Sequence, residues 1–215
     1  MRARCGESAD VPEIVLVASD QERAGALERA RAWGVPAAVL RERGSDTAQL
    51  HELLRAHEVE LIVLAGYLRL VPRSIVREYS GRTINVHPAL LPAFGGAGMY
   101  GGRVHQAVIE AGAQVSGVTV HFVDEEYDRG AIIAQWPVPV FPGDSAKTLA
   151  ARVLRVEHIL LPRAVCAVAR GSVRLGDGRL IPAAEMDNPI YEAFILRGEN
   201  DEQIAEGIAA MLPGA

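Results

Sequence analysis

The chain has 215 residues, of which 49% are hydrophobic and 23% charged. These values are typical of a globular domain and exclude a disordered, collagen-like or coiled-coil protein. Two cysteines exclude a disulfide-rich scaffold, and a net charge of −5 argues against a nucleic-acid-binding face.

Short apolar strands alternate with helices through the first half of the chain. The expected strands are 13–18, 36–40, 61–65 and 83–86, and the expected helices are 24–33, 46–57 and 72–79. Because each strand is followed by a helix, the pattern predicts βαβ units in an α/β fold. The continuous apolar runs indicate a mostly parallel central sheet that is flanked by helices.

The second half follows another pattern. A loop rich in glycine and proline covers 88–102, and a helix is expected over 104–111. Alternating strands at 117–123 and 131–138 predict a hairpin, and a long helix follows to residue 169. We expect an irregular segment 1–12, one domain 13–171, and a tail 172–215 with a short helix near 202–212.

Two segments carry candidate chemistry. Asn85 and His87 are two residues apart at the end of an expected strand, so they point the same way, where α/β sheets bind ligands. Together they suit a developing oxyanion, although a core histidine beside a turn-forming asparagine is an equal alternative. The second segment is the acidic loop 124–128, which is either a solvated turn or the source of a carboxylate that raises the pKa of the histidine. The scattered histidines show no metal-binding spacing, so no metal is expected.

The motifs NVHPALLP, VTVHFVDEEYDRGAII and ARVLRVEH resemble the glycinamide ribonucleotide formyltransferase family, in the same order and with similar gaps. The resemblance runs from about residue 13 to 171. It implies a Rossmann-like formyltransferase fold and a role in purine biosynthesis. The implied reaction transfers a formyl group from the cosubstrate 10-formyltetrahydrofolate to the amine of glycinamide ribonucleotide. In that reaction Asn85 donates to the oxyanion, His87 acts as an imidazolium, and Asp128 holds His87 and raises its pKa.

The resemblance also implies two sets of binding residues. The folate set comprises Arg43, Leu68, Arg69, Leu70, Val71, Asn85, Asp124, Glu125, Glu126, Tyr127 and Asp128. The ribonucleotide set comprises Leu154, Arg155, Val156 and Glu157. Taken alone, Arg69 is more typical of a surface cation and Glu157 of a surface acid on a helix, but their register with the motifs favours the binding roles. His121 matches a family histidine near the site, and its place in an alternating strand favours a structural role.

One departure from the family pattern concerns the first strand and its Gly-Ser-Asn turn, which holds the substrate phosphate in the family. Residues 13–18 match the family's second strand, so we expect a shortened N-terminus with two unpaired strand edges in the sheet. Such a chain should be unstable as written and should bind the ribonucleotide poorly.

Three hypotheses follow: a formyltransferase, a 10-formyltetrahydrofolate hydrolase (deformylase), and a folate-binding protein without turnover. The expected partners are these small molecules, with no nucleic acid or membrane. We expect a cytoplasmic monomer or homodimer, since no apolar run is long enough to span a bilayer and no signal-peptide pattern is visible.

Overall fold

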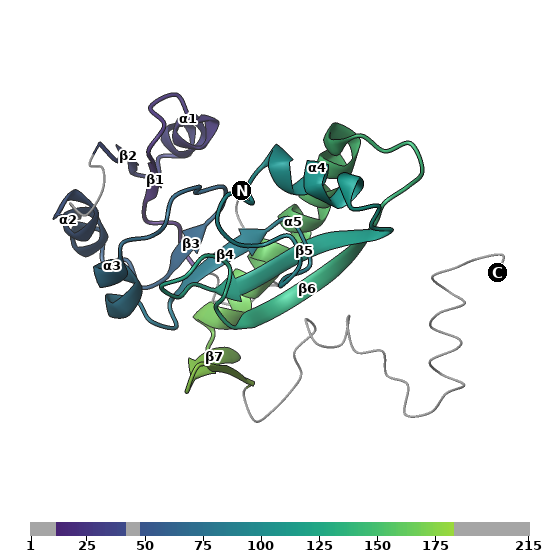
Figure 1. Cartoon of the computed structure of the whole chain (residues 1–215). Helices are drawn as coiled ribbons and strands as arrows, with labels where there is room; N and C mark the ends of the chain where they lie inside the picture. The colour runs from purple at the N-terminus through teal and green to yellow at the C-terminus, as the bar shows by residue number, and fades with distance from the viewer. Residues whose placement is uncertain (1–11, 42–47, 183–215) are drawn as a thin grey trace.

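The computed structural model describes residues 12–41 and 48–182, which form an α/β fold (Figure 1). Its main sheet has four strands in the order β3-β4-β5-β6. The strands are β3 (Ile62–Leu64), β4 (Thr83–His87), β5 (Val115–Phe122) and β6 (Ile132–Pro139). The α/β class is as expected from the sequence.

The direction of the strands differs in part from the expectation of a mostly parallel sheet. β3 and β4 are parallel, but β5 is antiparallel to both β4 and β6, so this sheet is mixed. The short polar connection between β5 and β6 reverses the chain, which makes this pair antiparallel, whereas the direction of β5 relative to β4 follows from the path of residues 88–114. The expected hairpin is confirmed.

The N-terminal elements form a unit with its own small sheet. β1 (Val17–Ser19) and β2 (Ala37–Val39) pair in parallel on either side of α1 (Gly25–Ala32). Next come α2 (Ala48–Ala56) and α3 (Arg73–Glu78), whose buried residues pack with those before and after β3. Pro72 precedes the first turn of α3, where its fixed backbone angle suits a helix start.

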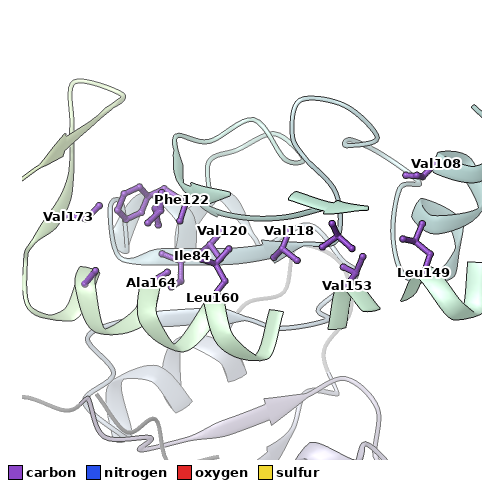
Figure 2. Close-up of a cluster of buried hydrophobic side chains, with 14 residues drawn as sticks. Ile84, Val108, Val118, Val120, Phe122, Leu149, Val153, Leu160, Ala164 and Val173 are labelled. Atoms are coloured by element: carbon purple, nitrogen blue, oxygen red, sulfur yellow. The ribbon is translucent and has the colours of Figure 1, made fainter. Parts of the chain in front are cut away.

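The main core lies between the four-stranded sheet and the long helix α5 (Ala146–Ala169), with α4 (Gly102–Glu110) at one end. Figure 2 shows Ile84, Val118 and Val120 from the sheet facing Leu160 and Ala164 of α5. Ser145 caps α5 by accepting a hydrogen bond from the Thr148 amide, which satisfies one of the free N–H groups of the first turn. This core supports β4, which carries two of the candidate catalytic residues.

A hairpin follows α5 within the residues that we assigned to the tail. β7 (Val173–Gly176) pairs with β8 (Arg179–Pro182) through Asp177 and Gly178, both of which have positive φ angles. An Asp-Gly pair between two short strands is a strong hairpin signal that we overlooked in the sequence. Val173 belongs to the main core, so the hairpin is anchored there. The helix expected near 202–212 lies outside the described residues.

A cavity of about 2620 Å³ lies between β1 and β3. Among residues 12–41 and 48–182, no strand joins the small sheet to the main one. The apolar side chains of Ile14 and Val63 line the cavity and are 46% and 39% exposed, and Leu161 and Val165 of α5 line it as well. β1 and β3 each pair with only one other strand among the described residues, which places the two expected strand edges at this cavity.

Candidate active site

His87 is the last residue of β4, and its side chain is buried. Its Nε2 lies 2.8 Å from the carbonyl oxygen of Phe94. Because a carbonyl only accepts hydrogen bonds, Nε2 carries the proton of the neutral ring, and Nδ1 is the atom that can take up a second proton. Nδ1 lies 3.6 Å from Oδ2 of Asp128, so a proton taken up there meets a carboxylate.

Asp128 lies in the connection between β5 and β6 and has a φ of +55°. Its short polar side chain tolerates this left-handed backbone better than most residues do. Oδ2 accepts a hydrogen bond of 2.8 Å from the Gly96 amide, which ties this loop to the loop that follows His87. Two residues further along the chain, position 130 must be glycine, because an added Cβ would collide with the Phe122 carbonyl oxygen. The close packing of the two loops holds the carboxylate beside His87.

Asn85 and His121 lie directly opposite each other on β4 and β5. Nδ2 of Asn85 is 3.1 Å from Nε2 of His121, and the same Nε2 is 3.6 Å from Oδ1 of Asp128. The structural role that we expected for His121 is therefore incomplete, because its ring contacts two candidate catalytic residues. The sequence hid this because the contact depends on the pairing of β4 with β5.

Thr119 is a second residue that sequence reasoning missed. Its hydroxyl donates to the Ala89 carbonyl at 2.6 Å and accepts from the Leu91 amide at 3.0 Å. Gln135 on β6 donates to the Leu91 carbonyl as well. These buried bonds fix the backbone that follows His87. A strand threonine gives no signal of such a role in the sequence alone.

Burial and neighbouring groups act in opposite directions on the pKa values of His87 and Asp128. Burial lowers the pKa of the His87 imidazole below its ordinary value, against the opposing effects of the Asp128 charge and the Phe94 carbonyl. The Asp128 charge acts to raise the pKa of His87, as expected, but desolvation of the buried ring outweighs this effect, so the net pKa lies below the ordinary value. Burial also acts to raise the pKa of the Asp128 carboxyl, but the nearby His121 ring, the hydrogen bond from the Gly96 amide and the nearby His87 ring together outweigh this and lower it.

The expected folate residues at 68–71 follow β3. Leu68 and Leu70 are exposed, whereas Val71 is buried in the cluster formed with α2 and α3. Arg69 pairs with Asp20 at 3.1 Å. Side-chain contact with a ligand is therefore open to the two leucines, and Val71 can contribute only its backbone.

The expected folate loop 124–128 lies beside this segment, since Val123 packs on the cluster that contains Val71. Asp124 accepts a hydrogen bond of 2.9 Å from the Glu126 amide, which shapes the loop. Glu125 is bound by Arg77 at 2.7 Å and by Arg73 at 3.3 Å, and the Arg77 bond lowers the pKa of its carboxyl. Glu125 is thus engaged by the protein itself, whereas the Tyr127 side chain is exposed.

The expected ribonucleotide residues lie on α5. Leu154 and Arg155 are exposed, and Val156 packs against the main core. Glu157 is half-buried, and burial raises the pKa of its carboxyl. The neighbouring His158 acts to lower this pKa, and burial outweighs it. Arg43 lies outside the described residues.

The described part of the chain contains no group of three or more histidine, cysteine, aspartate or glutamate residues that could hold a metal ion. None of its helices is long and apolar enough to cross a membrane.

The model of the formyl transferase family matches residues 2–165. The chain belongs to this family. It is 41% identical over 176 residues to a chloroplastic phosphoribosylglycinamide formyltransferase of Arabidopsis thaliana, an alignment that covers 79% of this chain and 60% of that protein. The chain thus spans about three fifths of the length of this relative.

Solved structures of the family share the fold. A phosphoribosylglycinamide formyltransferase of Anaplasma phagocytophilum aligns with a TM-score of 0.74 and 33% identity, covering 82% of this chain and 84% of that one. A formyltetrahydrofolate deformylase of Pseudomonas syringae aligns with a TM-score of 0.69 and 27% identity, covering 79% and 56%.

Proposed function

We propose that this chain transfers a formyl group from 10-formyltetrahydrofolate to the amine of glycinamide ribonucleotide in purine biosynthesis. The observation that carries the proposal is the group formed by Asn85, His87 and Asp128 at the carboxyl end of β4, with 3.6 Å between His87 and Asp128. This group belongs to a chain of the formyl transferase family with a phosphoribosylglycinamide formyltransferase among its relatives. Cytoplasmic location and a monomeric or homodimeric state stay predictions of the sequence.

In the proposed reaction the amine nitrogen attacks the formyl carbon, and the electron pair of the carbonyl moves to its oxygen. Asn85 donates an N–H to that oxyanion. His87 takes the proton lost by the amine at Nδ1, where Asp128 stabilises the resulting charge. When the oxyanion collapses, the bond to N10 of the folate breaks, and the proton ends on N10.

The binding residues divide between the two substrates. Leu68, Leu70 and Tyr127 offer exposed apolar surface for the folate ring, and Glu157 offers a half-buried carboxylate for the ribose hydroxyls. Because Arg69 and Glu125 are paired within the protein, we assign them to shaping the folate site.

The test measures folate product from 10-formyltetrahydrofolate with and without glycinamide ribonucleotide. Product that forms only with the ribonucleotide supports the transferase. Product without it supports the hydrolase, the candidate favoured by the similarity to the Pseudomonas syringae deformylase. Binding without product in either case supports a folate-binding protein and refutes both enzymes.

A folate analogue without a transferable formyl group tests the binding site separately. It should raise the melting temperature by linkage, since it binds the folded state only. No increase at saturating analogue contradicts the folate site in the 68–71 and 124–128 segments.

A further inference from the structure

We propose that His121 is a positioning residue, which fixes the amide of Asn85 with its amino group turned toward the His121 ring. The inference rests on the proposed function in one respect, namely the role of Asn85 as a donor to the oxyanion. It concerns a histidine that the catalytic group Asn85, His87 and Asp128 does not include.

The orientation of the His121 ring follows from its other nitrogen. Nδ1 of His121 lies 2.7 Å from the carbonyl oxygen of Phe122, which can only accept a hydrogen bond. The neutral ring therefore carries its proton on Nδ1. Nε2 is left with a lone pair, and its partner must be a donor.

The donor at Nε2 is the amino group of Asn85, 3.1 Å away. A rotated amide would place its oxygen against the lone pair of Nε2 and lose the hydrogen bond. One N–H of Asn85 is thus held by His121. The second N–H has no other partner among the described residues, so a carbonyl oxygen in the site can receive it.

Asp128 could favour the other tautomer of His121, with the proton on Nε2. Its Oδ1 lies 3.6 Å from Nε2 of His121, beyond hydrogen-bond length but close enough to attract a proton on that atom. A proton on Nε2 would repel the amino group of Asn85 and turn the ring toward Asp128. The bond to Phe122 keeps the neutral ring in the form that serves Asn85.

His121 lies on the face of β5 that is opposite to the main core, so its side chain is available to the site. Val118, Val120 and Phe122 of β5 face the main core, so His121 points to the opposite side of the sheet. A register irregularity between β5 and β6 lies at Val120 and His121. Such irregularities re-aim side chains and are common beside functional sites.

The first test is a double-mutant cycle on kcat and KM. His121→Leu removes the acceptor and should lower kcat by about tenfold to about a hundredfold with little change in KM, as a misplaced group does. His121→Gln can place an amide oxygen near the position of Nε2 and should recover most of the rate. In an Asn85→Ala background His121→Leu should cost nothing further, because the effect passes through Asn85.

Val120→Ala is the matched control, since it lies next to His121 but faces the core. It should lower the melting temperature and leave kcat unchanged. If His121→Leu lowers kcat as much in the Asn85→Ala background as in the wild type, His121 does not act through Asn85.

The second test needs no turnover and so separates this inference from the proposed function. Nitrogen-15 NMR of the histidine rings at neutral pH should show His121 as the neutral form protonated on Nδ1. His121→Leu should also shift the side-chain amide resonances of Asn85. A His121 ring that is protonated on Nε2, alone or together with Nδ1, overturns the inference even in an active enzyme.

Discussion

Asp128→Asn separates the charge of the carboxylate from its shape. Asparagine has nearly the same size, tolerates the positive φ of +55°, and can still accept the bond from the Gly96 amide. What it loses is the negative charge 3.6 Å from His87. The fold should therefore remain, while the stabilisation of a proton on His87 disappears.

The size of the effect follows from that distance. Coulomb's law over 3.6 Å gives about 1 kcal/mol in water-like surroundings and about 5 kcal/mol at an effective dielectric constant of about 20. Since about 1.4 kcal/mol corresponds to a tenfold change in rate, kcat should fall by about tenfold to about 10³-fold. The acid limb of the profile of kcat/KM against pH should move to lower pH, because the negative charge that acts to raise the pKa of His87 is gone while burial still lowers it.

The assay is the initial rate of folate product at fixed ionic strength between pH 5 and 9, with 10-formyltetrahydrofolate and glycinamide ribonucleotide. Glu110→Gln on the exposed end of α4 changes the net charge equally and should leave the rate unchanged. If Asp128→Asn keeps a rate within twofold of the wild type and the same acid limb, the charge of Asp128 has no part in catalysis.

Three further predictions concern His87, Gly130 and Asp144. His87→Ala should lower kcat by about 10²–10⁴-fold while the melting-temperature increase by a folate analogue persists; an unchanged rate contradicts its proton-transfer role. Gly130→Ala should lower the melting temperature, because its Cβ meets the Phe122 carbonyl, whereas Gly25→Ala, which meets nothing, should not; equal melting of both variants would refute the close approach. Asp144→Ala should lower the melting temperature near neutral pH through loss of its bonds to Arg152. Those bonds hold the pKa of the Asp144 carboxyl below its ordinary value, so the stabilisation is present above about pH 4 and is lost as the pH falls, and the two melting temperatures should converge in acid.

The strands and helices were predictable where periodicity was strong. Each element expected between residues 13 and 169 has a counterpart in the described structure, shifted by a few residues, because apolar runs and helix starts are local signals. The antiparallel direction of β5 relative to β4 was not predictable, since it depends on how residues 88–114 cross the sheet. The hairpin at Asp177 and Gly178 was available in the sequence and was overlooked.

The candidate site was predictable only in its residue identities. The motif brought Asn85, His87 and Asp128 into one proposal, and the fold brings the side chains together. The net lowering of the His87 pKa was not predictable, because it depends on how deeply the ring is buried, and no spacing in the sequence reports that. The contacts of His121 and Thr119 arise between strands and loops that are distant in the chain.

The separation of the small sheet from the main one divides the protein into regions of unequal stability. Leu27 and Ala30 of α1 are buried, yet they belong to neither of the two core clusters, and β1 bonds to β2 alone among the described strands. The β1-α1-β2 unit can therefore open by local unfolding while β4, β5 and α5 stay closed. Its backbone amides should exchange with solvent deuterium at a lower free energy than those of β5. The arrangement of Asn85, His87 and His121 would then survive openings that expose residues 17–39.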